Sequence, residues 1–400
     1  MSSEQGQPAP FPYYLLHQAS ASRLDYFKAY TVAHPALKQA DQAVWNALRE
    51  PAGASLIFIF GPTGVGKTTL LTQIEKRLVD LSPSQGGAER GLLPALRVDA
   101  VAPALNHFKW GDYYQRALCL LQEPVVEYTV DYHTQVPRLS RTRVERELLL
   151  SRRPTDTAAL RLAFEHTLRL RKPRAILIDD AEHMAKAARG SKLLDQLDHI
   201  KSLAIMTHTV HVLVGTYDVL VFRNLSAQLS RRSVDVHFAR YRATTEAEVR
   251  AFRSVLWALQ RNVPLEEEPD LLQHWQYCYE RTVGCVGVLK DWLTRVLAEA
   301  LERGEKTISR ALLARHALSV DRCEQMLTEA MAGEMALTED DHAAYRLRVR
   351  LGLEQGPMPH QGQKQQDKGQ GVGSIPSQAY AHRVGHRKPH RDRVRNSEIG

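Results

Sequence analysis

The sequence contains only four cysteines, and they are widely spaced. They stand at positions 119, 278, 285 and 323, without a C-x-x-C pair and without histidines at metal-ligand spacing. This pattern predicts reduced thiols in the protein core and argues against a structural metal site. Internal repeats of solenoid length are absent, and so is a zinc-finger or homeodomain signature that would read DNA bases.

Long apolar runs are missing as well. No stretch approaches the roughly 20 residues of a membrane span, and the first residues lack the basic, apolar and small regions of a signal peptide. We therefore expect a cytoplasmic protein without a membrane partner. With 44% apolar residues in a chain of 400, there is enough material for two or three domains with a full core.

A glycine-rich loop gives the strongest local signal. Residues 61–68 match G-x-x-x-x-G-K-[ST], between an apolar strand pattern at 55–60 and a helical pattern at 69–78. Glycines let backbone N–H groups curl round phosphates without a Cβ clash, and the following helix adds its dipole. The expected contacts to a nucleoside triphosphate are Gly61, Pro62, Thr63, Gly64, Val65, Gly66, Lys67, Thr68 and Thr69. The hydroxyl of Thr68 is also expected at Mg²⁺.

A second motif follows at 175–180, where an apolar strand pattern ends in two acids. A nucleotide hydrolase needs one carboxylate for the metal and another group to activate water. Asp179 is the predicted metal carboxylate, and it is expected to hold Mg²⁺ through the water shell of the ion. Asp180 stands where many such ATPases have glutamate, so either Asp180 or Glu182 is the expected catalytic group, and slow hydrolysis is the alternative.

The order of the next motifs resembles the AAA+ ATPases. An apolar strand pattern at 211–215 ends at Thr216, and a helix pattern after it ends in Arg231 and Arg232. The resemblance implies ATP and Mg²⁺ as cofactors, Thr216 as the sensor-1 group, and Arg231 or Arg232 as a finger acting on a neighbouring subunit's site. A basic helix end that merely complements the helix dipole is the alternative for the two arginines.

From position 241 on, amphipathic helix patterns replace the apolar strands. Thr245 and Glu248 form a capping-box pattern, and we expect further helices at 270–278, 287–301 and 309–322. In the AAA+ pattern, such a lid carries a sensor-2 base, and Lys290 is the residue available here. The expected fold is an α/β AAA+ P-loop core with a parallel sheet flanked by helices. Its parts are an aromatic segment with a helix over the adenine side (1–50), the nucleotide-binding domain (51–240), an all-helical lid (241–351) and a disordered basic tail (352–400).

Three further stretches narrow the resemblance. They are His34-Pro35-Ala36-Leu37, Val98-Asp99-Ala100-Val101-Ala102-Pro103 and Phe108-Lys109-Trp110-Gly111-Asp112-Tyr113-Tyr114. Over about residues 25–320 the chain resembles the TnsC and TniB group of transposition ATPases from Tn7-like elements. This implies a regulator that forms a ring or helical filament on double-stranded DNA with ATP and disassembles on hydrolysis. Its implied partners are itself, transposase subunits and a target selector, either TniQ/TnsD-like or RNA-guided.

Basic residues provide candidates for the DNA contacts. The net charge of +8 fits an anionic partner. The candidates are Lys109 and Arg116 beside the aromatic stretch, and Arg141, Arg143 and Arg146 in a long insert. For both groups the alternative is that the aromatics are core and the basic residues a solvated face.

Two other functions stay open at this point. One is a replication-initiator or clamp-loader-like AAA+ ATPase, which shares the same core. The other is a nucleotide-binding interaction module that hydrolyses little ATP, which the aspartate at 180 keeps possible. The aromatic residues at 11–16 and 26–27 are expected either to dock a partner or to pack on the chain's own ATPase core.

Overall fold

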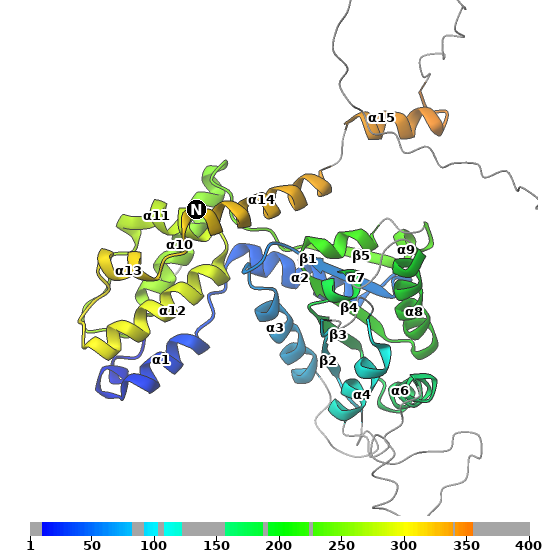
Figure 1. The fold of residues 1–400 in the computed structure, drawn as a ribbon, viewed down its shortest axis with the longest axis horizontal. Helices are drawn as coiled ribbons and strands as arrows, with labels where there is room; N and C mark the ends of the chain where they lie inside the picture. Colours follow the sequence, from blue (N-terminus) through cyan, green and yellow to red (C-terminus); the bar gives the residue numbers. More distant parts are fainter. Residues whose placement is uncertain are drawn as a thin grey trace, which may run out of the picture. The chain divides into compact units, whose positions relative to one another are not determined.

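The computed structural model describes residues 10–81, 92–102, 108–121, 157–186, 191–223, 227–338 and 341–354 (Figure 1). The predicted DNA contacts Arg141, Arg143 and Arg146 lie outside these residues, as does the predicted tail from 355 onward. The chain divides into two units, Met1–Thr338 and Glu339–Gly400. The described part of the second unit contains the helix α15 (Asp341–Arg350).

A parallel sheet of five strands forms the centre of the first unit, in the order β2-β3-β4-β1-β5. The strands are β1 (Leu56–Phe60), β2 (Ala95–Asp99), β3 (Ala175–Asp179), β4 (Val210–Gly215) and β5 (Ser233–His237). All residues of β1 and β3 are buried. Near-continuous apolar runs suit strands that are covered on both faces, which is why these two motifs were recognisable in the sequence.

Helices cover both faces of the sheet. On one face, α2 (Pro35–Arg49) and α3 (Lys67–Asp80) pack with Ile57, Ile59 and Leu177. On the other, α4 (Trp110–Leu120), α6 (Thr157–Arg171) and α8 (Ser191–Thr207) pack with Phe58 and Leu213. Successive residues of β1, β3 and β4 alternate between the two cores, as the two-residue period of a β-strand requires.

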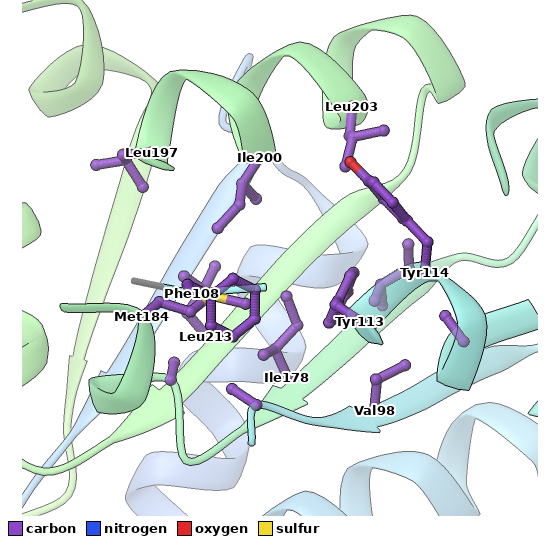
Figure 2. Packing of buried hydrophobic residues seen from close by; sticks show 14 of the residues in the cluster. Val98, Phe108, Tyr113, Tyr114, Ile178, Met184, Leu197, Ile200, Leu203 and Leu213 are labelled. Atoms are coloured by element: carbon purple, nitrogen blue, oxygen red, sulfur yellow. The ribbon is translucent and has the colours of Figure 1, made fainter. Parts of the chain in front are cut away.

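The aromatic stretch of α4 belongs to this second core. Tyr113 and Tyr114 are buried, and Figure 2 shows them with Phe108 among Ile178 and Leu203. The ring stack is extended by Trp110, whose indole N–H donates to Gln196 at 2.6 Å. The alternative that these aromatics belong to the core is therefore confirmed for the two tyrosines, because their rings are enclosed by the chain itself.

Short elements connect the carboxyl edge of the sheet to the rest of the unit. They are α7 (Glu182–Lys186) after β3 and η3 (Tyr217–Phe222) after β4. A further short helix, α9 (Ala227–Arg232), ends where β5 begins and therefore lies at the opposite, amino edge of the parallel sheet. The predicted site residues Asp179 and Asp180 lie just before α7, and Thr216 lies just before η3. The carboxyl edge therefore collects the glycine-rich loop, these two acids and Thr216, whereas Arg231 and Arg232 lie at the amino edge.

A second hydrophobic core lies among helices and the loops that connect them. It is formed by α10 (Glu246–Arg261), η4 (Leu272–His274), α11 (Trp275–Thr282), α12 (Val286–Arg303) and α13 (Arg310–His316). The predicted cap of α10 is present, since Thr245 Oγ1 accepts from the N–H of Glu248 at 3.4 Å. The largest buried side chain of this core is that of Trp292, at 1% exposure.

The helix predicted at 309–322 is wrong. The structure has α13 and then a separate helix, α14 (Val320–Leu337), because Ser319 starts a new helix by accepting the N–H of Arg322 at 3.4 Å. A side-chain cap of this kind satisfies an N–H group that has no partner inside the helix. The sequence analysis assigned no cap to this serine and predicted one helix across it.

The N-terminal aromatics pack on the helical core rather than on the sheet. The short helix η1 (Tyr13–His17) precedes α1 (Ser20–Ala29), and α1 lies beside α12 (Figure 1). Phe27 is fully buried there, whereas Tyr13 and Tyr14 are exposed. The expected packing within the chain is confirmed for Phe27, but its partner is the helical core and not the ATPase sheet.

Three of the cysteines, Cys278, Cys285 and Cys323, are buried and unpaired as expected. Cys119 is exposed, so the prediction of a core thiol is wrong at that position. Among the described residues, no helix is long and apolar enough to span a bilayer, and none of their histidine, cysteine and acidic side chains form a group of three suited to a metal ion.

Candidate nucleotide-binding site

The glycine-rich loop connects β1 directly to α3. Gly64 and Gly66 have φ angles of 75° and 114°, which lie in the left-handed region that glycine adopts without strain. Gly66 is the N-cap of α3, so Lys67, Thr68 and Thr69 form the first turn of the helix. Backbone N–H groups without partners at this helix start are suited to phosphate oxygens.

Lys67 folds back onto the loop. Its Nζ donates hydrogen bonds to the carbonyls of Gly61 at 3.0 Å and Pro62 at 2.9 Å. Burial lowers the pKa of Lys67, and the carboxylate of Glu182 acts in the opposite direction. A half-buried ammonium that donates to two loop carbonyls is well placed to exchange them for phosphate oxygens.

The residues at this edge fit a magnesium ion by their chemistry. Asp179 is the last residue of β3 and is 5% exposed, and the Thr68 hydroxyl lies on the first turn of α3. β4 lies between β1 and β3, so the loop and Asp179 are two strand spacings, or roughly 10 Å, apart. Hydroxyl and carboxylate oxygens are the ligands that Mg²⁺ prefers.

Asp180 and Glu182 occupy different environments. Asp180 is exposed, and its backbone φ is 52°. Burial of its carboxyl group and the nearby charges of Asp179 and Glu182 raise the pKa of Asp180. Glu182 is buried at 8% exposure, and its Oε2 accepts the N–H of Thr216 at 3.3 Å. Asp180 thus faces solvent at the edge of the sheet, while Glu182 is hydrogen-bonded to the main chain just after β4.

Thr216 follows β4 and lies between the loop and β3. Its Oγ1 accepts the N–H of Asp218 at 3.4 Å and caps η3. Beside it, a cavity of about 470 Å³ is lined by Pro62, Thr63 and Thr216 together with residues of α14, including Glu329 and Gly333. The predicted sensor group therefore shares a cavity with the phosphate loop.

The helix α14 was missed by the sequence reading, although it borders this cavity. Gly333 lies so close to Tyr217 that an added Cβ would stand 2.0 Å from the ring. The next residue, Glu334, accepts hydrogen bonds from Arg240 at 2.9 and 3.2 Å, and Arg240 is 8% exposed. These contacts join segments about 100 residues apart in the chain, so no local sequence pattern could predict them.

Lys290 lies on α12 but turns toward α1. Its Nζ donates to the carbonyl of Phe27 and lies 3.7 Å from the centre of the Phe27 ring. Burial lowers the pKa of Lys290 to about 8. In this position the side chain lines a cavity beside Gly66 and Thr69, and a sensor-2 contact to the end of the phosphate chain would require it to leave Phe27.

That cavity, of about 130 Å³, is also lined by His34, a residue to which the sequence assigned no role of its own. His34 is the N-cap of α2, where its Nδ1 lies 3.4 Å from the N–H of Leu37 and 3.0 Å from the Tyr241 hydroxyl. Burial lowers the pKa of His34 to about 4, so the ring is neutral at pH 7. A neutral, fixed ring among apolar side chains is suited to a nucleobase. Proline after the histidine was the available signal, since proline is favoured at a helix start.

The remaining predicted residues lie on exposed surface. Arg231 and Arg232 end α9, and the carbonyl of Arg232 accepts the N–H of Ser55 at 2.9 Å. Lys109 and Arg116 are exposed at α4, where Arg116 pairs with Asp112 at 3.0 Å. Both border a cavity of about 320 Å³ at the end of β2.

Comparison with known proteins identifies the domain type. Residues 49–221 match the AAA_22 family model, described as an AAA domain. No curated protein sequence matches the chain.

Several solved structures are similar at low identity. ORC2 from Aeropyrum pernix, in ADPNP–ADP complexes, has 15% identity and a TM-score of 0.44, over 82% of this chain and 78% of that one. Drosophila ORC bound to DNA has 13% identity and a TM-score of 0.41, over 89% and 88%. A Walker-type ATPase of Pyrococcus abyssi has 14% identity and a TM-score of 0.39, over 78% and 75%. The AAA domain match and the strand order around the glycine-rich loop together give this chain the AAA+ P-loop fold, a parallel five-strand sheet flanked by helices.

Proposed function

We propose that the chain is a Mg²⁺-dependent ATPase whose nucleotide site is the carboxyl edge of the sheet. The observation that carries the proposal is the glycine-rich loop between β1 and α3, with Asp179 at the same edge two strands away. Ligands of open parallel sheets bind outside the carboxyl ends of the strands. The cluster of a lysine, a threonine hydroxyl and acids there has the composition that phosphoryl transfer to water requires.

The proposed roles follow from the surroundings of each side chain. Lys67 would exchange its loop carbonyls for phosphate oxygens, and the Thr68 hydroxyl and the Asp179 carboxylate would hold the metal. Bound Mg²⁺·ATP supplies the phosphoryl group and the metal's charge. Asp180, solvent-facing and with a raised pKa, accepts the proton of the attacking water. Glu182 fixes the main chain at Thr216, so that the polar group at the end of β4 faces the loop.

Self-association completes the proposed site. Arg231 and Arg232 are exposed at the end of α9, and an exposed arginine is available to a second copy of the chain. A guanidinium supplied by a neighbouring subunit stabilises charge that develops on the transferred phosphoryl group. The resemblance to TnsC and TniB supports a finer proposal: an ATP-gated ring or filament on double-stranded DNA that links a target selector to a transposase.

The DNA-binding part of this proposal rests on charge and on that resemblance. Lys109 and Arg116 remain candidate phosphate contacts because both are exposed beside the cavity at the end of β2. Contacts of this kind position a protein on the duplex without reading its sequence. Target choice then has to come from a separate selector.

The test is negative-stain electron microscopy of the full chain with double-stranded DNA and either a slowly hydrolysed ATP analogue, ADP or no nucleotide. We expect rings or filaments with the analogue alone, and none for Lys67→Ala, which also loses nucleotide affinity. The matched control is Lys76→Ala, which removes an exposed lysine from α3, the helix that also carries Lys67. Rings or filaments that form equally with the analogue, with ADP and without nucleotide would contradict ATP-dependent assembly. ATP turnover without any assembly would favour a clamp-loader-like ATPase that requires its partner protein to assemble.

A further inference from the structure

Arg97 lies on β2 and connects the two elements that carry the proposed metal ligands. Its Nη2 donates to Asp179 Oδ2 at 2.9 Å, and its Nη1 donates to Thr72 Oγ1 at 3.0 Å. Thr72 Oγ1 in turn donates to the carbonyl of Thr68 at 2.9 Å. One guanidinium therefore contacts Asp179 directly and Thr68 through a single hydroxyl. No role was expected for this arginine from the sequence.

These contacts engage both carboxylate oxygens of Asp179. Its Oδ2 is taken by Arg97, while its Oδ1 accepts the N–H of Asp180 at 3.1 Å. The side chain of Asp179 is 8% exposed and that of Arg97 is 23% exposed, so water screens this pair only in part. Glu75 lies 3.9 Å from the same guanidinium, which holds the arginine in place from the side of α3.

The negative charge at this edge is considerable. Asp180 adjoins Asp179 in the chain and donates its N–H to the Asp179 carboxylate, and Glu182 follows three positions after Asp179 at the start of α7. A group of carboxylates attracts divalent cations, and a positive charge within hydrogen-bond distance of one member weakens that attraction. Arg97 is the described cation bonded directly to Asp179.

We propose that Arg97 is a positioning residue that holds Asp179 and suppresses divalent-cation binding at the site until nucleotide phosphates arrive. A cation that arrives alone meets the guanidinium, whereas a cation that arrives with phosphates brings compensating negative charge. The metal is therefore taken up as part of the nucleotide complex. This inference rests on the proposed nucleotide site, and it adds the residue that regulates that site's metal.

The experiment measures Mn²⁺ binding to the full chain without nucleotide, by the electron paramagnetic resonance signal of free Mn²⁺. Removing the positive charge in Arg97→Gln is expected to tighten Mn²⁺ binding about tenfold or more. Arg97→Met, which keeps the apolar stem, is expected to do the same and serves if the glutamine variant fails to fold. Arg97→Lys keeps the charge and should bind Mn²⁺ as weakly as the wild type.

Two controls separate this role from a structural one. Arg77→Gln removes another arginine, which contacts Asp41 at 3.1 Å from α3, and should leave Mn²⁺ binding unchanged. Arg97→Gln combined with Asp179→Asn should lose the gained affinity. Equal Mn²⁺ affinity in Arg97→Gln and the wild type overturns the proposal, as does a gain that persists without Asp179.

The outcome is independent of ATP turnover because no nucleotide is present. A failure to bind ATP would remove the proposed function and leave the Mn²⁺ result standing. A second readout is the Mg²⁺ concentration that half-saturates binding of a fluorescent ATP analogue, which should fall in Arg97→Gln. An unchanged Mg²⁺ requirement, together with intact nucleotide binding, would count against Arg97 and not against the nucleotide site.

Discussion

The backbone N–H of Val288 donates a hydrogen bond to the carbonyl of Gly64 at 3.0 Å, which joins the first turn of α12 to the phosphate loop. The contact depends on a glycine next to Val288. A Cβ on Gly287 would stand 2.5 Å from that carbonyl oxygen. Because the loop must keep its shape to bind phosphates, the helical core takes part in forming the nucleotide site.

Gly287→Ala should weaken ATP binding about tenfold, since the methyl group forces α12 off the loop and distorts its backbone. Equilibrium titration with a fluorescent ATP analogue measures the effect. Gly304→Ala is the matched control: its φ of 65° makes alanine strained, but no atom lies within 4 Å of the added Cβ. The control should lose some stability and keep its affinity. Equal affinity losses in both variants would show that general strain is the cause.

Substitutions of Asp180 and of Glu182 are expected to affect catalysis differently. Asp180→Asn should lower kcat about 100-fold and keep ATP affinity, because it removes the proposed proton acceptor. Glu182→Gln should cost less in kcat and lower the melting temperature, since its carboxylate is buried against the N–H of Thr216. Steady-state kinetics and thermal unfolding of the two variants test this assignment. The reverse ranking in kcat would transfer the role to Glu182.

The pH profile gives an independent check on Asp180. Only the ionised carboxylate accepts a proton, so activity is lost as the pH falls through the pKa of Asp180. Since that pKa is raised, the acidic limb should lie above the ordinary value of 3.8. Asp180→Glu should keep an acidic limb, whereas Asp180→Asn should flatten it. A limb that is identical in wild type and Asp180→Asn belongs to another group.

Much of the fold was predictable because its signals are local. The glycine-rich loop, the apolar run before Asp179 and the cap at Thr245 each lie within a few residues, and the structure has the strands and helices that they predicted. The roles assigned to those residues stay predictions. The boundary between α13 and α14 was predicted wrongly because the helical pattern continues across Ser319, which caps α14.

The contacts missed at the site are between distant segments. Arg97 and Asp179 are 82 positions apart, and Arg240 and Glu334 are 94 apart. An arginine within a strand has many possible partners, and only the pairing of β2 with β3 selects Asp179. His34 likewise reads as an ordinary polar residue before a helix, until Tyr241 is brought to its ring. These contacts form only when the chain folds, so a short stretch of sequence could not predict them.

Arg231 and Arg232 give a prediction about self-association. Arg231→Ala together with Arg232→Ala should leave ATP affinity nearly intact and lower oligomer-dependent turnover by roughly 10³, as expected when a guanidinium acts in trans. Turnover is measured against protein concentration with DNA present. Mixing this variant with Lys67→Ala protein should restore part of the activity, because each supplies what the other lacks. An equal loss in dilute monomer, or no complementation, would contradict action in trans.

Buried histidines should make the folded state sensitive to mild acid. Burial lowers the pKa of His34, His199 and His211 to about 4, against an ordinary value of 6.5. The unfolded chain therefore binds protons first as the pH falls, so stability is full above about pH 6.5 and is lost toward pH 4. For one such histidine the total loss is about 3 kcal/mol.

His211 provides the cleanest test of this pH dependence. It is 1% exposed, and its Nε2 has no hydrogen-bond partner among the described residues. Phenylalanine should therefore replace the ring at modest cost, losing the contact between Nδ1 and the Thr209 carbonyl. Between pH 7.5 and pH 5, urea unfolding should show about 2 kcal/mol less loss of stability in His211→Phe than in the wild type. The control is His166→Phe, which removes an exposed histidine of α6. Identical pH dependence in His211→Phe and wild type would mean that the ring is already protonated, or solvated, in the folded protein.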